Sequence, residues 1–292
     1  MPGGKVGGNA TEPRNRTLCL IAFSWQPGGR RPLLLLANRD EFYDRPTAPA
    51  QWWPDHPHIW GGRDLQAGGS WLGLTRGGRF AAITNHRDGR AAPLAAARSR
   101  GELVADFLAG SLSPQDYMAG VMARRHGYQG FNLLVGDLIG GELWYGGNRE
   151  GADARPLAPG LYGLSNAVLD SPWPKVERLK QGLAALATDH SEAEALALLG
   201  DKGRAADEAL PDTGISREWE RALSAVFIVH PGYGTRAQTL VSLAADGSLS
   251  VVELGFNDER QGRALQPDRV RRLQLSLRKK AEPASGQVVG LP

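Results

Sequence analysis

The chain has 292 residues, of which 41% are hydrophobic, and a formal net charge of +3. This length is enough to bury a substantial core in one large domain or two small ones, and no apolar run approaches the roughly 20 residues that a membrane-spanning helix needs. The basic residues are mostly arginines spread along the chain, which argues against a nucleic-acid partner, because such a partner selects clustered positive charge. The N-terminal segment lacks the apolar region of a secretory signal, so we expect a cytoplasmic protein without stable membrane insertion.

The predicted elements start after residues 1–17, a polar, glycine-rich segment that we expect to be disordered. The apolar run 17–25, a Gly-Gly turn and the run 31–40 predict a β-hairpin. Residues 44–69 are rich in proline, glycine and tryptophan without periodicity, and predict a long ordered loop. Two more strand–turn–strand patterns follow at 70–88 and 131–148. Between them, helices are expected near 99–109 and 113–126, the second with Ser113 before Pro114 as its start signal.

The second half of the chain predicts helices near 173–187, 191–200 and 217–223, and then strands at 224–230 and within 235–256. Strands therefore cluster towards both ends with most helices between them, which favours antiparallel sheets covered by helices over a parallel α/β fold. We predict one domain over residues 18–281 and a disordered tail at 282–292. The basic stretch 268–280 is interpreted as a solvated terminal element.

Cys19 is the single cysteine, so neither an intramolecular disulfide nor a CxxC metal site can form. A lone cysteine in an apolar strand is usually a small core residue. The hairpin would however place it beside Asn38, Arg39, Asp40 and Glu41, the polar end of the second strand. An arginine beside a thiol lowers the pKa of the thiol, which makes Cys19 a candidate nucleophile.

Side chains alternate along an extended chain, so Arg39 and Glu41 would point to one face and Asn38 and Asp40 to the other. Such a group could line a site, or it could be a surface ion-pair cluster at an ordinary strand end. We favour the site, because the strand that carries Cys19 is the expected neighbour.

Asparagines at strand ends are candidate oxyanion donors, namely Asn85, Asn132 and Asn166, although asparagine is also common in turns. The strand-end histidines have no partner at metal-ligand spacing, and no metal site is predicted. The glycine-rich stretches lack the strand and helix context of a nucleotide-binding loop.

Several of these stretches resemble one known family. "CLIAFSW", "LLLANRDEFYDRP", "GGSWLGLTRGGRFAAITNHRD", "GLYGLSNAVLDSPWPKVERLK" and "YGTRAQTLV" resemble the NRDE-motif family, over most of residues 18–260. Its animal members are called transport and Golgi organisation proteins. The family is similar to the N-terminal-nucleophile hydrolases, which implies an α+β fold with a four-layer αββα sandwich of antiparallel sheets.

The resemblance implies hydrolysis of a carbon–nitrogen amide bond by Cys19, whose own α-amine serves as base, with no cofactor required. Arg39 and Asp40 would hold the thiol and the amine, and Asn85 would help to form the oxyanion hole. The aromatic residues of 42–60 suggest a small substrate with an apolar acyl or planar group. Further ligand contacts are expected from Asn38, Glu41, Trp52, Trp60, Trp71, Asn166 and Arg236.

The chain departs from the family pattern at its start. Family members begin Met-Cys, whereas eighteen residues precede Cys19 here, and an internal cysteine has no α-amine. The segment could be a propeptide, a mis-assigned start with Leu18 in the place of the initiator methionine, or a retained extension that excludes this catalysis. We favour the mis-assigned start.

The alternative function is a non-catalytic protein that binds and carries haem, a lipid or an acyl group on the same fold. The tryptophan-rich segment would then clasp a porphyrin or an acyl chain, with His56 or His58 nearby. Of the two functions we favour hydrolysis.

Overall fold

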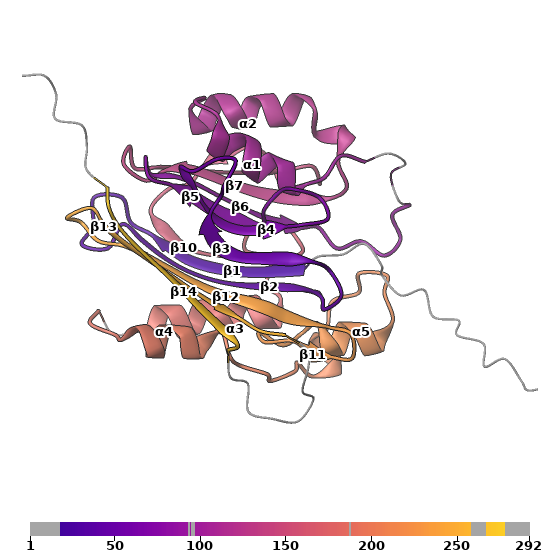
Figure 1. Ribbon diagram of the computed structural model, residues 1–292. Helices are drawn as coiled ribbons and strands as arrows, with labels where there is room; N and C mark the ends of the chain where they lie inside the picture. The colour runs from indigo at the N-terminus through magenta and orange to yellow at the C-terminus, as the bar shows by residue number, and fades with distance from the viewer. Residues whose placement is uncertain (1–17, 93, 95–96, 187, 258–266, 278–292) are drawn as a thin grey trace, which may run out of the picture.

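The computed structural model describes residues 18–92, 94, 97–186, 188–257 and 267–277. Figure 1 shows four layers: helices α1 and α2, a first sheet, a second sheet, and helices α3, α4 and α5. All strand pairings within both sheets are antiparallel. The predicted α+β class with an αββα sandwich is therefore confirmed.

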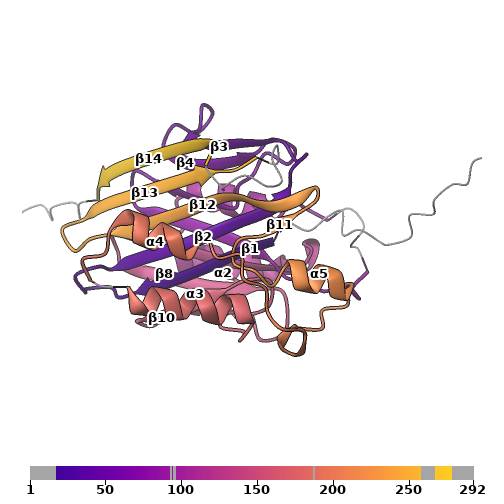
Figure 2. The same ribbon diagram turned by 90° about the horizontal axis from the view of Figure 1, so that it is seen from below.

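One sheet contains both ends of the described chain, and its strand order is β10-β1-β2-β12-β13-β14, with β11 paired to β12 (Figure 2). The helices α3 and α4 cross its outer face. Its strands are β1 (Leu18–Trp25), β2 (Leu33–Phe42), β10 (Gly160–Leu164), β11 (Val229–His230), β12 (Tyr233–Leu243), β13 (Ser248–Gly255) and β14 (Arg269–Ser276).

The other sheet follows the chain order from β3 to β9 without a crossover. Its strands are β3 (Thr47–Trp52), β4 (Ile59–Asp64), β5 (Leu72–Thr75), β6 (Arg79–Asn85), β7 (Phe131–Asp137), β8 (Glu142–Gly147) and β9 (Arg155–Pro156).

The leucine run of β2 is buried on both faces of its sheet. Leu33 and Leu35 belong to the large core cluster that includes residues of both sheets, whereas Leu34 and Leu36 pack in a second cluster with residues of α3 and α4, such as Val176. A strand covered on both faces reads as a continuous apolar run instead of an alternating one. Four successive leucines therefore mark a central strand of the sandwich.

The helices begin close to their predicted positions. Ser113 Oγ accepts a hydrogen bond from Asp116 N at the start of α2, as the Ser-Pro signal predicts. A capping box formed by Ser191 and Glu194 starts α4. The helices are α1 (Gly101–Ala109), α2 (Pro114–Ala123), α3 (Pro174–Ala185), α4 (Glu192–Leu198) and α5 (Arg217–Ala222).

The loop predicted for residues 44–69 is wrong, because this segment contains the hairpin of β3 and β4. Of the four prolines that hid the pattern, only one occupies a strand position. Pro49 lies in β3, which is the edge strand of its sheet, at an irregularity in the pairing with β4. An edge strand tolerates proline, since a missing backbone donor there breaks no ladder.

The strand predicted for residues 224–230 is also mostly wrong, because only Val229–His230 pairs as a strand. The position beside β2 is already taken by β12. The backbone groups of the apolar run bond to other partners instead: Val226 O accepts from Asn38 Nδ2, and Phe227 N donates to Asp201 O. The run is a buried irregular segment.

The predicted extension 1–17 and the tail 282–292 lie outside the described residues, and the domain limits stay predictions. In the described part of the chain, none of the helices has the length and the apolar character needed to cross a membrane. The cytoplasmic location stays a prediction.

Candidate active site

Cys19 lies at the start of β1, directly opposite Arg39 of β2. Leu18 is paired with Asp40 in the same register. On the other side of β1, the pairing with β10 begins only at Ile21, so the first residues of β1 have a strand partner on one side alone. Beyond the paired part of β10, the Ser165 side chain lies beside Cys19, with its Oγ 3.0 Å from Cys19 O.

The Cys19 thiol is buried, with 4% of the residue exposed. The pKa of the thiol is raised to about 12, first by burial and then by the Asp40 carboxylate, against the Arg39 guanidinium, which lowers it. At neutral pH the thiol of this internal cysteine is therefore protonated. Nucleophilic attack by its sulfur requires a base that takes this proton.

Arg39 is held on the face of β2 that points towards the other sheet. Its Nη1 donates to Thr47 Oγ1 at 3.1 Å, its Nη2 lies 3.6 Å from Glu41 Oε2, and its guanidinium stacks over Trp71 at 4.3 Å from the ring centre. Arg39 and Glu41 thus share a face, as the alternation predicts. Glu41 also lies 3.6 Å from Arg45 Nε.

Asn38 and Asp40 occupy the opposite face, which packs against the helices. Asn38 Nδ2 donates to Leu199 O at 3.0 Å and to Val226 O at 2.8 Å, so this side chain anchors the helix layer and does not line a cavity. Asp40 Oδ1 accepts from Thr235 Oγ1 at 2.6 Å. Complete burial raises the pKa of Asp40 to about 6, in opposition to the nearby Lys175 ammonium, which lowers it.

Lys175 is a site residue that the sequence analysis missed. It lies in the first turn of α3 and is only 1% exposed. Burial lowers the pKa of its ammonium to about 8, against the Asp40 carboxylate, which raises it. One sequence signal could have found it, because a lysine in the first turn of a helix is unfavourable next to the positive end of the helix dipole.

Asn85 and Asn166 come together beside Cys19. Asn166 Nδ2 donates to Asn85 O at 3.0 Å. Ser165 Oγ, also missed by the sequence analysis, lies 3.0 Å from both Cys19 O and Asn166 Oδ1, and its one proton can serve either oxygen. Asn132 Oδ1 instead accepts a hydrogen bond from Tyr145 OH, and Asn132 Nδ2 donates to Ala167 O, so this side chain supports the core.

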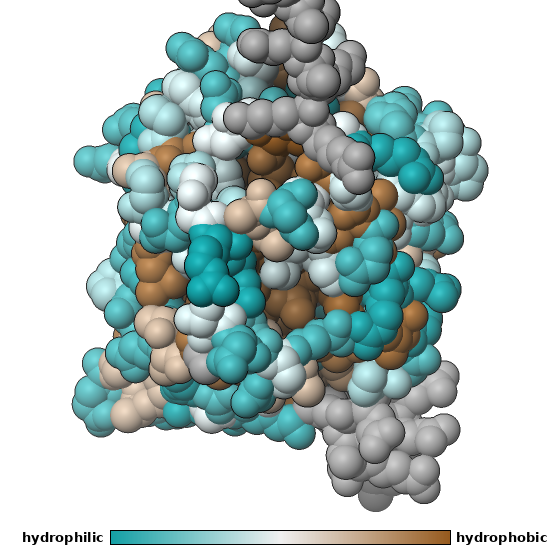
Figure 3. Space-filling view, turned by 90° about the vertical axis from the view of Figure 1, so that its left-hand side faces the viewer, coloured by the Kyte–Doolittle hydropathy of each residue, from teal (hydrophilic) through white to brown (hydrophobic). Residues whose placement is uncertain are grey.

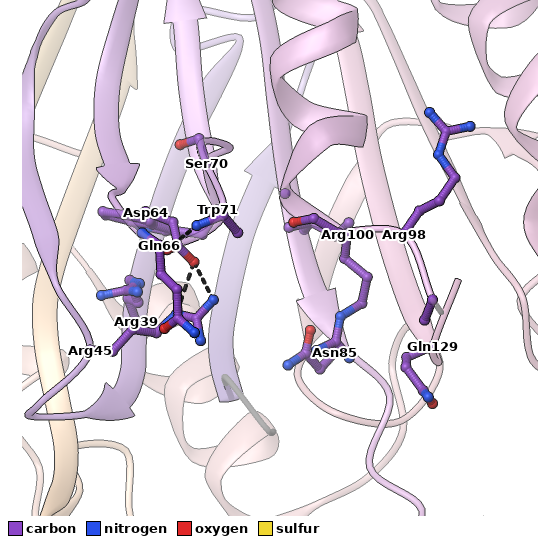
Figure 4. A pocket seen from close by; sticks show the side chains of 15 residues that line it. Arg39, Arg45, Asp64, Gln66, Ser70, Trp71, Asn85, Arg98, Arg100 and Gln129 are labelled. Carbon is purple, nitrogen blue, oxygen red and sulfur yellow. Dashed lines mark hydrogen bonds and ion pairs between the residues drawn. The ribbon is translucent and has the colours of Figure 1, made fainter. Parts of the chain in front are cut away.

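A cavity of about 300 Å³ opens next to this network. Figure 4 shows Arg39, Arg45 and Gln66 on one wall and Arg100 extended towards Asn85 on the other. The residues that line the cavity include four arginines, namely Arg39, Arg45, Arg98 and Arg100, and one carboxylate, Asp64. Glu41 and Glu102 add two carboxylates behind them, which leaves a small excess of positive charge.

The cavity arginines are fixed in place. Arg45 Nη2 lies 2.7 Å from Asp64 Oδ2, Arg98 Nε lies 2.6 Å from Glu102 Oε1, and Arg100 Nη1 donates to Gly130 O at 3.2 Å. These contacts orient the guanidinium groups before a ligand arrives.

The predicted tryptophans fall in different places. Trp71 lines the cavity, whereas Trp52 and Trp60 pair with each other at the far end of the β3–β4 hairpin, about four residues, or roughly 13 Å, from Asp64. His56 and His58 lie in the turn of that hairpin. The structure does not bring these four residues to the cavity, and their predicted roles, together with haem or lipid carriage, stay predictions.

Arg236 forms hydrogen bonds to the backbone at the end of β2 and in the segment that follows it. Its Nη1 donates to Phe42 O at 2.8 Å and to Arg45 O at 3.2 Å. Arg236 therefore acts on the cavity through the position of Arg45. Within the residues that the structure describes, no group of three or more His, Cys, Asp or Glu side chains is arranged to hold a metal ion.

A second cavity, of about 640 Å³, lies at the opposite end of the sandwich, where the turns after β1, β7 and β12 meet. Figure 3 shows this face, with apolar side chains visible between hydrophilic ones. None of the predicted site residues lines it.

The fold and the site define an α+β protein of αββα architecture, with a thiol opposite a guanidinium and beside a buried carboxylate. Residues 18–258 match the family model described as Transport and Golgi organisation 2. The chain belongs to this family, and the predicted resemblance is confirmed.

Curated relatives agree with this assignment. The chain is 38% identical over 265 residues to the Transport and Golgi organization protein 2 homolog of Bos taurus, an alignment that covers 81% of this chain and 92% of that protein. It is 36% identical over 266 residues to the Homo sapiens homolog, with 83% and 94% covered. The Drosophila melanogaster protein is 28% identical over 268 residues, with 81% and 91% covered.

Solved structures give weaker likenesses. They include a Caenorhabditis elegans N-acylethanolamine-hydrolyzing acid amidase ortholog (TM-score 0.42, 13% identity, 62% of this chain and 85% of that one covered). Penicillin V acylase from Agrobacterium tumefaciens has a TM-score of 0.41 at 10% identity, with 86% and 84% covered. A mutant conjugated bile acid hydrolase from Clostridium perfringens has a TM-score of 0.40 at 10% identity, with 89% and 93% covered. Likenesses of this size say nothing about activity.

Proposed function

We propose that this protein is a cysteine amidohydrolase in which Cys19, as the first residue of the active chain, attacks the carbonyl carbon of an amide bond in a small molecule. The observation that carries the proposal is the register of β1 and β2. It sets Cys19 opposite Arg39 and its preceding peptide bond beside Asp40, where β1 extends beyond its pairing with β10. Arg39 and Asn85 also line the charged cavity.

The reaction follows from these groups. The α-amine of Cys19 takes the thiol proton, and the thiolate forms a bond to the carbonyl carbon of the substrate. The oxyanion accepts hydrogen bonds from donors at the cavity wall, where Asn85 lies. The ammonium then returns the proton to the leaving amine as the carbon–nitrogen bond breaks, and water hydrolyses the thioester with the amine again as base.

The proposal gives the segment before Cys19 a decisive role. While Cys19 is internal, its nitrogen belongs to a peptide bond and cannot act as a base, and burial keeps the pKa of its thiol at about 12. The 292-residue chain is therefore inactive in this reaction. Activity requires a chain that begins at Cys19.

The charge of the cavity supports a class of substrate. Four arginines stand against three carboxylates, Asp64 in the lining and Glu41 and Glu102 behind it, and the remaining positive charge favours an anionic group. Trp71 is the only tryptophan among the lining residues. We therefore replace the expected apolar substrate by one that carries a carboxylate or a phosphate close to the scissile amide.

The test uses a chain that begins at Cys19, the 292-residue chain and Cys19→Ala in both. N-acyl amino acids, which carry a carboxylate, are compared with N-acyl amines of the same acyl length. We expect turnover only by the chain that begins at Cys19, loss of turnover in Cys19→Ala, and at least a tenfold preference for the carboxylates. Equal rates with and without the Cys19 thiol would refute the proposal.

A further inference from the structure

A buried group of three side chains lies under the start of β1, on the helix face of its sheet. It consists of Asp40 from β2, Thr235 from β12 and Lys175 from α3, none of them more than 1% exposed. Thr235 Oγ1 donates to Asp40 Oδ1 at 2.6 Å. Among the described residues, Asp40 Oδ2 and Lys175 Nζ have no hydrogen-bond partner. Two opposite charges thus lie on the same buried side of the sheet and act on each other through space, and each has an unused hydrogen-bonding atom.

The surrounding charges leave Asp40 as the main counter-charge of Lys175. The other titratable groups that act on Lys175 are Arg87, Glu220 and Cys19. Arg87 and Glu220 form their own buried ion pair, with Nη2 and Oε2 2.9 Å apart.

The other charged groups that act on Asp40 also pair with each other. They are Arg39 and Glu41, which pair with each other on the opposite face of β2.

Burying a lysine in this way costs stability, because an ammonium without hydrogen-bond partners loses its hydration. Methionine would fill the same space without this cost. A costly group that is kept next to a proposed reaction centre indicates a function for its charge.

The position of the group relative to Cys19 suggests what that function is. Asp40 is the register partner of Leu18, and α3 packs against β1. A chain that begins at Cys19 lacks Leu18 and has its α-amine where that peptide bond was. This amine would then share the Asp40 carboxylate with the Lys175 ammonium.

We propose that Lys175 is a positioning residue of the active site, whose buried ammonium acts through space on the Asp40 carboxylate and keeps the α-amine of Cys19 in its neutral, basic form. This inference rests on the proposed function. A carboxylate alone would stabilise the protonated amine, whose ordinary pKa is roughly 7.7–8.0. A second cation at the same carboxylate opposes that protonation, so a larger fraction of the amine can accept the thiol proton at neutral pH.

The experiment follows alkylation of Cys19 by iodoacetamide against pH, read by intact mass. Cys19 is the single cysteine, so each added group reports this thiol alone. The measurements use a chain that begins at Cys19, with the natural sequence and with Lys175→Met, Lys175→Arg and Lys180→Met. Lys180 is the matched control, because it lies on the same helix but pairs with Asp170 at 2.7 Å, away from the site.

We expect Lys175→Met to shift the rising limb of the plot of alkylation rate against pH to higher pH by at least half a unit, so that the rate at pH 7 falls about threefold. Lys175→Arg should restore much of the natural profile, and Lys180→Met should reproduce it. A Lys175→Met profile that coincides with the natural one would overturn the inference while the proposed function stands.

Failure of the proposed function has a different signature. If acetylation of the α-amine in the natural sequence leaves the alkylation rate unchanged, the amine is not the base and both proposals fall. Thermal unfolding of every variant checks that it is folded, and Lys175→Gln takes the place of Lys175→Met if the methionine variant does not fold.

Discussion

Arg39 illustrates at the residue scale how the candidate site combines chemistry with packing. The side chain is buried, yet it contacts a threonine, a carboxylate and an indole ring from separate segments. Its planar guanidinium can stack on Trp71 and donate sideways at the same time, which a lysine ammonium cannot do.

We expect Arg39→Ala to lower the free energy of unfolding by about 2–4 kcal/mol, because it removes the packing of the guanidinium on Trp71 and one of the two arginines that lie beside the buried Glu41 carboxylate. Urea denaturation measures this change. The matched control is Arg76→Ala, since Arg76 also stacks on a tryptophan, at 3.7 Å from the ring centre of Trp52, but is exposed. The control should lose less than about 1 kcal/mol; a similar loss in both variants would show that burial of Arg39 adds nothing.

Glu253 gives a prediction about pH at the same scale. It lies in β13, Ala50 N donates to its Oε1 at 2.7 Å, and burial raises the pKa of its carboxyl from 4.5 to about 7. The folded state therefore binds this proton more tightly than the unfolded state, and the fold loses stability as the pH rises from about 4.5 to about 7.

Glu253→Gln keeps the acceptor for Ala50 N and removes the titration. Compared with the natural protein, we expect this variant to be more stable by about 3 kcal/mol at pH 8, and by little at pH 5. Urea denaturation at the two pH values checks this. A gain that is the same at pH 5 and pH 8 would contradict a raised carboxyl pKa.

At the scale of elements, the close contact between the segment before β5 and the start of α1 shapes the cavity. A Cβ on Gly69 would lie 2.3 Å from the backbone carbon of Gly101, so only glycine permits this approach. Gly101, together with the neighbouring Ser70, lines the cavity. The second glycine of "GGSW" thus has a steric reason.

Gly69→Ala should therefore push α1 away from β5 and cost about 1–3 kcal/mol of unfolding free energy. Gly120→Ala is the control, because a Cβ at Gly120 in α2 meets nothing within 4 Å. There alanine should be neutral or stabilise by up to about 1 kcal/mol, since it is the better helix former. Thermal and urea unfolding compare the two, and an equally stable Gly69→Ala would show that the contact can relax.

An element could be predicted from the sequence when the interactions that form it join residues close together in the chain. The β1–β2 hairpin, the cap at Ser113 and the alternation of Arg39 and Asp40 follow from neighbours in sequence. The β3–β4 hairpin could not be predicted, because tolerance of Pro49 depends on its place at the edge of a sheet. Lys175 was missed for a similar reason: its partner Asp40 is 135 positions away in the sequence, and only the packing of α3 on β1 brings them together.

At the scale of the whole molecule, the proposed reaction depends on where the mature chain begins. We expect intact-mass analysis of protein made in its native host to show a species that starts at Cys19. This species should react with iodoacetamide at pH 7 at least tenfold faster than the 292-residue chain, since only the former has an α-amine beside its thiol. A full-length species as the sole product would remove the hydrolase proposal.

In the sheet that contains β1, the edge strand β14 is paired on one side only among the described residues. Arg271 and Arg272 are exposed on this strand. A bare sheet edge is a template for growth by addition of further strands. Arg272 pairs with Glu192, whereas Arg271 of each molecule would approach Arg271 of the other when two such edges meet, and this repulsion grows as the ionic strength falls. Concentrated solutions should therefore resist aggregation best at low ionic strength. Added salt screens the repulsion and should be the first condition under which copies assemble into fibres.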